Sequence, residues 1–328
     1  MESTNLKAIL TPPSLMKSLM AGFDAVSNHV SLILFSVLLD LVLWFGPHVR
    51  IVKLFEPIFQ QAATYPEMKN AGTMELLRAG VERLNLLSVV RTFPIGIPSL
   101  MAGRSPVGTP YTYPPVWFDI SSFGAGLGLW FLFVFAGLAV GTLYFSAVAQ
   151  ATLATQIDWR STISQWPWNF AQVTLLSLFW FLLIACFMVP LSCVLSILLL
   201  LGMGITQFPL LIALFLGGIL VWLTIPLFFS PHGIFAKHRP MWISLIQAVR
   251  LSRITFSTTG LLILVIVVLS EGLNVLWNVP AENSWLMLVG IAGHAFITTG
   301  LLSATYIYYR DADLWLEQTI QQKQAKPA

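Results

Sequence analysis

Charged side chains are scarce in this sequence. Only 9% of its 328 residues are Asp, Glu, Lys or Arg, whereas a soluble globular protein carries about 25%. Residues 120–157, 161–236 and 283–309 contain no charged residue at all. Each of these runs exceeds the roughly 20 apolar residues that cross a bilayer. The composition therefore excludes an ordinary soluble domain and predicts an all-α, polytopic integral membrane protein.

Cysteine and recognisable catalytic motifs are also rare or missing. The only cysteines, Cys186 and Cys193, lie in an apolar run, which argues against a disulfide framework or a metal site. The sequence has no G-x-S-x-G, H-E-x-x-H or Walker motif, and its few basic residues form no nucleic-acid footprint. We therefore expect no enzymatic activity, no metal and no nucleic-acid partner.

Hydrophobic runs predict six membrane spans in a single domain. We place these spans at about residues 28–46, 123–151, 170–201, 209–229, 257–276 and 285–308. Two glycines and a proline in residues 202–209 provide the turn between the third and fourth spans. Lys and Arg in the short loops favour a cytoplasmic N-terminus. We expect a bacterial-type plasma membrane, both termini in the cytoplasm and one long outer loop at about 47–122.

Amphipathic stretches precede the odd-numbered spans, at residues 18–23, 161–166 and 244–249. The last stretch is the clearest, with apolar residues on one helical face and polar residues on another. The apolar face holds Trp242, Leu245, Ile246 and Val249, and the polar face holds Ser244, Gln247, Arg250 and Arg253. The pattern favours three units of inner surface helix plus hairpin, although any segment entering a membrane tends to be amphipathic.

The outer loop is the one sizeable polar region. Residues 51–59 have helical spacing that Pro57 should kink, and residues 73–91 predict a second helix. A segment rich in proline and aromatic residues follows and predicts an extended return to the membrane. The loop could act as a lid over the outer face or as a docking surface for a partner.

Ionisable residues inside spans are costly, so Asp40, Glu271 and His294 are the first functional candidates. Counting along the predicted helices places all three between the midplane and the outer leaflet. Thr298 shares a helix face with His294. Together they could carry protons or bind a cation. Alternatively, the two carboxylates lie near outer helix ends and reach interfacial water.

Small residues mark further positions in the spans. Gly124 and Gly128, and likewise Gly137 and Gly141, are one turn apart and allow a neighbouring helix to approach closely, within the protein or in a partner or homo-oligomer. Two more glycines, at positions 290 and 293, precede His294 and would leave room for a tetrapyrrole ligated by its ring nitrogen. A hydrogen-bonded packing histidine is the alternative, so we expect no cofactor.

Basic residues at the inner ends of spans suggest contact with lipid head groups. The candidates are Lys237, Arg239, Arg250 and Arg253. Anchoring by the positive-inside rule explains them as well. The function that fits these features is a membrane accessory or scaffold protein that binds partner proteins or lipids. A permease for a small solute or ion is the alternative, and a cofactor-binding subunit using His294 is a further one.

The second half of the chain resembles a known group. The letters ISLIQAVRLSR at residues 243–253, before the fifth span, and YIYYRD at residues 306–311, after the sixth, carry the likeness. They are similar to uncharacterised bacterial six-span proteins related to the membrane domain of glycerophosphodiester phosphodiesterases. The soluble catalytic domain of those enzymes has no counterpart in the sequence. The resemblance therefore implies a fold and no reaction.

Overall fold

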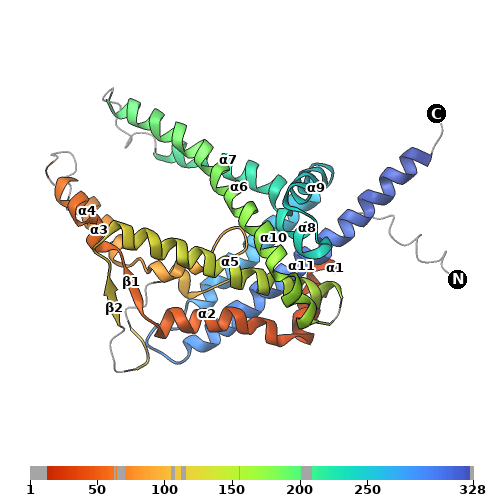
Figure 1. Ribbon diagram of the computed structural model, residues 1–328, viewed down its shortest axis with the longest axis horizontal. Helices are drawn as coiled ribbons and strands as arrows, with labels where there is room; N and C mark the ends of the chain where they lie inside the picture. Colours follow the sequence, from red (N-terminus) through yellow and green to blue (C-terminus); the bar gives the residue numbers. More distant parts are fainter. Residues whose placement is uncertain are drawn as a thin grey trace. The chain divides into compact units, whose positions relative to one another are not determined.

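The computed structural model (Figure 1) describes residues 13–62, 64, 71–104, 108–111, 116–154, 156–200 and 209–325. It is 80% helical, which confirms the all-α prediction. The α-helices are α1 (Leu15–Asn28), α2 (Leu34–Phe45), α3 (Val52–Ala62), α4 (Ala71–Glu82), α5 (Phe123–Leu153), α6 (Trp159–Leu200), α7 (Pro209–Leu227), α8 (Ser230–Lys237), α9 (Met241–Ile254), α10 (Phe256–Trp277) and α11 (Met287–Ala325). Short 3₁₀ helices are η2 (Val30–Ile33), η4 (Leu86–Val90) and η5 (Met101–Gly103), and the strands are β1 (His48–Arg50) and β2 (Trp117–Asp119).

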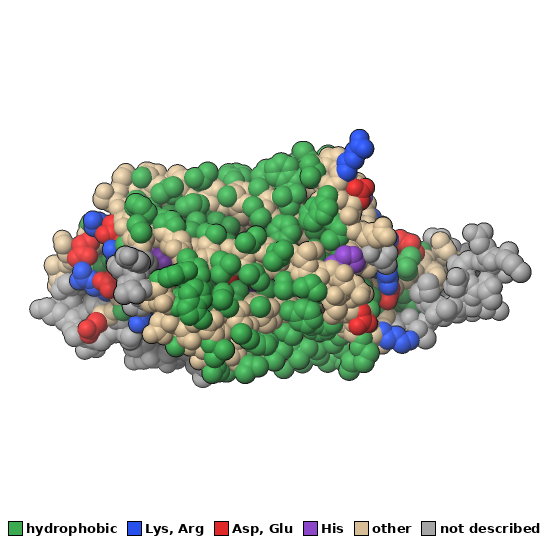
Figure 2. Space-filling view, turned by 90° about the horizontal axis from the view of Figure 1, so that it is seen from below, with side chains coloured by type: hydrophobic (Ala, Val, Ile, Leu, Met, Phe, Trp, Pro, Cys, Tyr) green, Lys and Arg blue, Asp and Glu red, His purple; other side chains and the backbone are tan. Residues whose placement is uncertain are grey.

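Long apolar helices make the chain a membrane-embedded protein. Within the described residues, five helices are long and apolar enough to cross a bilayer: α5, α6, α7 with α8, α10 and α11. The number rises to six if α1 and α2 form one bent span. Figure 2 shows hydrophobic side chains covering much of the face that it presents. The spans predicted at residues 123–151 and 257–276 agree with α5 and α10 to within two residues at each end.

The first predicted span, residues 28–46, corresponds to η2 and α2, which together cover Val30–Phe45. The chain bends by 90° between α1 and the η2–α2 segment. His29 leaves the helical conformation at the bend, with φ −130° and ψ 55°. Its ring nitrogen Nδ1 bonds to the Ala25 carbonyl oxygen at 3.1 Å, which occupies an acceptor that the helical backbone would otherwise use.

The third predicted span begins earlier than expected. Helix α6 starts at Trp159, so the predicted surface stretch at residues 161–166 forms its first turns and is not a separate helix. Asp158 explains this start, because its Oδ1 accepts hydrogen bonds from the backbone N–H groups of Arg160 and Ser161 at 3.0 and 3.2 Å. The predicted turn at residues 202–209 lies outside the described residues, apart from Pro209, which begins α7.

Contacts divide the chain into two compact units, and α1, α10 and α11 each contribute to both. Unit 1 comprises Met1–Ala21, Asp158–Ile266 and Ala304–Ala328, and unit 2 comprises Gly22–Ile157 and Val267–Ser303. The core of unit 1 includes Phe229, Ala248, Leu262, Tyr308 and Tyr309. The core of unit 2 includes Leu43, Trp44, Leu100, Met101, Met287 and Ile291. Each unit thus has its own buried apolar interior.

The segment predicted as an outer loop contains more structure than expected. Helix α3 continues through Pro57, and the helix predicted over residues 73–91 ends as α4 at Glu82, followed by η4. Asn85 caps η4 by accepting from Leu87 N at 3.1 Å, and it also accepts from Val49 N at 3.1 Å. Strands β1 and β2 pair in parallel, which the sequence did not predict.

Part of this segment packs beside a membrane helix. In α5, a Cβ atom added at Gly137 would lie 2.2 Å from the Val90 carbonyl oxygen, and one added at Gly141 would lie 2.3 Å from that of Ile95. Both glycines belong to the middle of α5. Residues 86–104 therefore do not simply cover the outer face, because part of their backbone packs against the middle of the apolar helix α5. Irregular backbone is tolerated there only where protein or enclosed water surrounds it.

Candidate functional site

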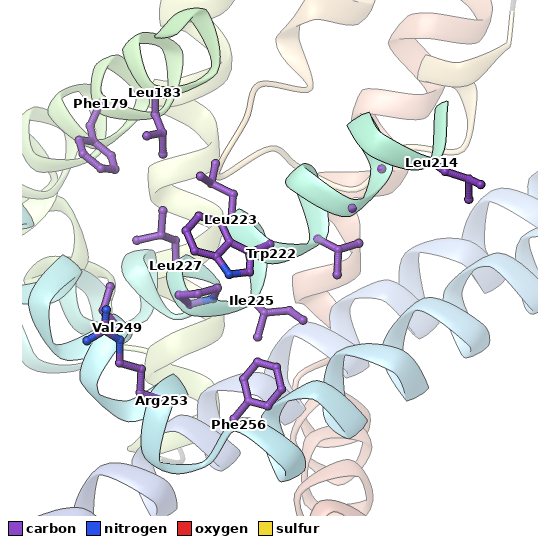
Figure 3. Close-up of a pocket in the computed structure, with 14 residues that line it drawn as sticks. Phe179, Leu183, Leu214, Trp222, Leu223, Ile225, Leu227, Val249, Arg253 and Phe256 are labelled. Atoms are coloured by element: carbon purple, nitrogen blue, oxygen red, sulfur yellow. The ribbon is translucent and has the colours of Figure 1, made fainter. Parts of the chain in front are cut away.

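A groove in unit 1 is a candidate binding site. It opens between α6, α7, α9 and α10 and has a volume of about 1020 Å³. Figure 3 shows its lining, which includes Phe179 of α6, Trp222 and Leu223 of α7, and Phe256 of α10. Small-molecule sites in proteins commonly enclose about 300 to 1,000 Å³. This groove is large enough for a long hydrocarbon chain.

One charge distinguishes the groove from a purely apolar surface. Arg253, in the last turn of α9, is the only ionisable side chain among the described residues that line it. Gly217 and Gly218 of α7 widen the opposite side, since nothing lies within 4 Å of a Cβ added at either residue. An apolar groove with one guanidinium suits an amphiphile whose anionic head binds the arginine.

Helix α9 positions Arg253 by packing through a narrow, small-residue face. Its buried side includes Ser244, Ala248 and Ser252, spaced four residues apart. The Ser244 hydroxyl donates to the Ser230 carbonyl oxygen of α8 at 2.6 Å, and Gly233 of α8 leaves room for the contact. Small residues at helix contacts are typical of membrane proteins.

The apolar face predicted for α9 is shared between the protein interior and the protein surface. Leu245 is buried, but Trp242 and Ile246 are exposed, while Ser244 on the predicted polar face is buried. The physical reason is that large side chains gain little by leaving lipid for protein, whereas small ones allow close helix packing. The sequence carried this signal in the four-residue spacing of Ser244, Ala248 and Ser252, and it was missed.

The other basic candidates in unit 1 have different surroundings. Lys237 of α8 and Arg239 pair with the buried Asp313 and with Glu317 of α11. Their charges are thus engaged within the protein. Arg250 is exposed on α9 and is not among the groove residues. Of the four predicted head-group contacts, Arg253 alone lines the groove.

Asp40 in unit 2 is buried and fully engaged. Its Oδ1 accepts hydrogen bonds from the Ser99 hydroxyl and, at 2.9 Å, from Met101 N. Its Oδ2 accepts from Leu100 N at 3.1 Å. Ser99 in turn accepts from Ala102 N at 3.0 Å. The carboxylate therefore accepts hydrogen bonds from backbone N–H groups that would otherwise need water as their acceptor.

Arg91 links two of the predicted ionisable residues. It lies close enough to interact electrostatically with both Asp40 and His294. His294 is buried, and its Nε2 has no hydrogen-bond partner among the described residues. Thr298 donates to the His294 carbonyl oxygen at 2.7 Å and so stays within its own helix. Asp40 and His294 thus share a basic neighbour that the sequence did not single out.

Glu271 is separate from this group. It is exposed on α10, and no ion pair or hydrogen bond of its side chain occurs within the described part of the chain. Asp40 and His294 thus share Arg91 as a neighbour, and no ion pair or hydrogen bond within the described residues joins Glu271 to them. Arg91 was missed because it lies in a segment that reads as an outer loop, where basic residues are ordinary.

The small residues of unit 2 make unequal contacts. Gly137 and Gly141 receive loop backbone and no neighbouring helix, whereas Gly128 has open space and Gly124 meets only its neighbour Ser122. A Cβ at Gly293 would lie 2.5 Å from the Trp277 ring. The indole thus fills the room that the glycines beside His294 had suggested for a planar cofactor.

Known proteins offer no further guide to the site. Comparisons with protein-family models, with curated proteins and with solved structures give no match for this chain. The resemblance to the six-span group therefore stays a prediction. The identity of the site rests on its own geometry.

Proposed function

We propose that this protein is a non-enzymatic, membrane-embedded accessory protein that binds an anionic lipid in the groove of unit 1. The groove itself is the observation that carries the proposal, because it combines an apolar lining with the single guanidinium of Arg253. The acyl chain of such a lipid would contact the apolar lining, and its phosphate would bind Arg253. Guanidinium and phosphate form paired, charge-assisted hydrogen bonds.

The surrounding helix supports the same ligand. The side chains of Trp242 and Ile246 on α9 are exposed, and so is that of Arg250 on the same helix. This arrangement is typical of a helix at the lipid head-group level. Arg253 lies one turn further along the same helix, where the C-terminal dipole also favours a cation. Its position at the head-group level would let a lipid enter sideways from the bilayer.

Native mass spectrometry tests the proposal. The purified protein would be stripped of lipid and then exposed to vesicles of phosphatidylglycerol or of phosphatidylcholine. We expect preferential retention of phosphatidylglycerol. Arg253→Gln should lower that retention by about tenfold, the loss expected for one charged hydrogen-bonded contact.

Two further variants separate the groove from general surface charge. Arg250→Gln removes a charge from the same helix outside the groove and should leave retention unchanged. Gly217→Leu fills the groove at a position with free space and should displace the lipid. Equal losses in Arg253→Gln and Arg250→Gln would contradict the proposal, as would full retention in Gly217→Leu.

Movement of a small solute or ion through unit 2 is a second candidate. The observation that favours it is the irregular backbone of residues 86–104 beside the middle of α5, with Arg91 near Asp40 and His294. Broken backbone at membrane depth is common in transporter sites. Uptake into proteoliposomes by Arg91→Gln and His294→Ala variants tests it, and unchanged uptake would remove this candidate.

The arrangement in the membrane is a further part of the proposal. We place the protein in a bacterial-type plasma membrane with six spans, α1 and α2 counting as one, and with both termini in the cytoplasm. The basic residues around α8 and α9 support this orientation. With six spans, this segment lies on the same side of the membrane as both termini, and basic residues favour the cytoplasmic side. A C-terminal fluorescent-protein fusion should fluoresce, and a C-terminal alkaline phosphatase fusion should be inactive. The opposite pair of results would reverse the orientation.

A further inference from the structure

Two opposite charges in unit 2 have no ion-pair partner among the described residues. Arg91 and Glu271 are both exposed, and neither side chain forms an ion pair within the residues that the structure describes. Arg91 interacts with Asp40 only at a distance, because that carboxylate is occupied by Ser99, Leu100 and Met101. Within the described part of the chain, each charge is therefore exposed and unpaired.

Both charges lie in or beside the helices of unit 2. Asp40, Glu271 and His294 are five, six and seven residues from the ends of their helices at Phe45, Trp277 and Met287. At about 1.5 Å per residue, each lies about 8 to 10 Å inside its helix end. These ends share one level, since Trp44 and Met287 belong to one core cluster against which Trp277 packs. Arg91 directly follows Val90, whose carbonyl oxygen packs against Gly137 inside α5, so its backbone also lies beside the apolar helices of unit 2.

An unpaired charge at this depth is unfavourable in hydrocarbon. Around Glu271, the exposed face of α10 is aliphatic and includes Val267, Val268 and Val275. Lipid tails would pack against those aliphatic side chains but would offer the carboxylate no hydrogen-bond donor or cation. The face is therefore suited to a protein surface that brings a hydrogen-bond donor or a cation to Glu271.

We propose that the occupant is a second copy of this chain, with Arg91 of each protomer pairing with Glu271 of the other. A two-fold dimer repeats every contact, so one arrangement satisfies both charges twice. A direct α10–α10 contact would instead bring the two Glu271 carboxylates together. A basic helix of another protein would pair with Glu271 but would leave Arg91 without a counter-charge. The pairing involves unit 2 only and does not depend on the lipid groove.

Charge reversal tests the pairing. The mass of the protein in phosphatidylcholine nanodiscs would be measured by native mass spectrometry. Wild type should be dimeric, whereas Arg91→Glu and Glu271→Arg should each be monomeric, because each places like charges opposite one another. The double variant should recover the dimer. A mixture of the two single variants should also form a dimer, with one copy of each.

A matched control and a second measurement distinguish the loss of a specific contact between protomers from misfolding. Arg250→Glu reverses an exposed charge in unit 1 and should remain dimeric. With Cys186 and Cys193 replaced by Ser, an Arg91→Cys chain mixed with a Glu271→Cys chain should be joined by a bifunctional maleimide, because the Cα atoms of an Arg–Glu pair lie farther apart than a disulfide can span. A monomeric wild type, dimers in both single reversals, or no cross-link in the mixture would overturn the proposal.

Discussion

At the scale of single residues, Asp40 shows how a buried carboxylate can serve backbone structure. Its two oxygens accept from one hydroxyl and two backbone N–H groups of residues 99–101. These donors would otherwise be unsatisfied in the apolar interior of unit 2, where each unsatisfied donor would cost several kcal/mol. Asp40 thus holds the inner part of residues 86–104 in place.

Removing the Asp40 carboxylate should loosen that segment. We expect Asp40→Ala to destabilise the protein by about 2 to 4 kcal/mol, because it orphans buried donors and leaves a void. Asp40→Asn retains one acceptor oxygen and should cost less. Thermal unfolding in detergent and hydrogen exchange of residues 99–102 measure the effect. Asp24→Asn, at an exposed position of unit 2, is the control, and equal stability of Asp40→Ala and Asp24→Asn would contradict this role.

The glycines of α5 provide a second residue-scale prediction. Gly137→Ala places a methyl group 2.2 Å from the Val90 carbonyl oxygen, so the backbone must move. We expect a loss of about 1 to 3 kcal/mol in unfolding free energy. Gly128→Ala meets nothing within 4 Å and should be neutral or slightly stabilising. Thermal midpoints of the two variants compare them directly, and a tolerated Gly137→Ala would show that residues 86–97 do not pack there.

These residues also show what the sequence can reveal about the site. The cost of burying a charge singled out Asp40, and glycine spacing singled out Gly137, without any structure. Their partners could not be predicted, because hydrogen bonds to backbone atoms of a distant loop leave no side-chain pattern. Arg253 was predicted as a head-group contact, but its groove depends on packing among four helices.

At the scale of elements, hydrophobic length was the reliable signal. It placed α5 and α10 almost to the residue, because crossing a bilayer requires a long apolar run. It did not reveal the bend at His29 or the start of α6, which depend on single side-chain hydrogen bonds by His29 and Asp158. The strands were missed because three residues are too few to show alternation.

The β1–β2 ribbon joins two ends of the outer segment through polar and aromatic contacts. His48 is buried against Trp117, with ring centroids 4.7 Å apart. Burial lowers the pKa of His48 below its usual 6.5, although the Gly46 carbonyl opposes the shift. At Asp119, partial burial raises the pKa, but Arg50 and Lys53 outweigh it and hold the value below the usual 3.8.

Acid should therefore weaken the ribbon through His48. A lowered folded-state pKa means that the unfolded chain takes up the proton first, so the contribution is complete above about pH 6.5 and falls as the pH drops below it. Asp119 stays ionised in this range and keeps its pair with Arg50. Hydrogen exchange of residues 48–50 and 117–119 should show less protection at about pH 5.5 than at about pH 7.5, after correction for intrinsic exchange rates.

A His48→Phe variant is the control for this prediction. Phenylalanine keeps an aromatic contact with Trp117 but cannot take up a proton. Its ribbon should keep the same protection at both pH values. Loss of protection in the variant as large as in wild type would assign the pH dependence to another group.

At the scale of the whole molecule, the two units present different surfaces to the membrane. Unit 1 holds the apolar groove with Arg253, and unit 2 holds residues 86–104 between its helices. Length and composition predicted that the protein is membrane-embedded and helical. They could not predict the division into units, because helices such as α10 and α11 run through both without any change in composition.

The central claim is that the groove between α6, α7, α9 and α10 holds an anionic lipid. An experimental structure of the protein in nanodiscs of phosphatidylglycerol tests it most directly. We predict acyl-chain density along Phe179, Trp222 and Phe256, with the phosphate within hydrogen-bond distance of the Arg253 guanidinium. A groove that is closed by its own side chains, or a lipid whose phosphate lies away from Arg253, would contradict the account.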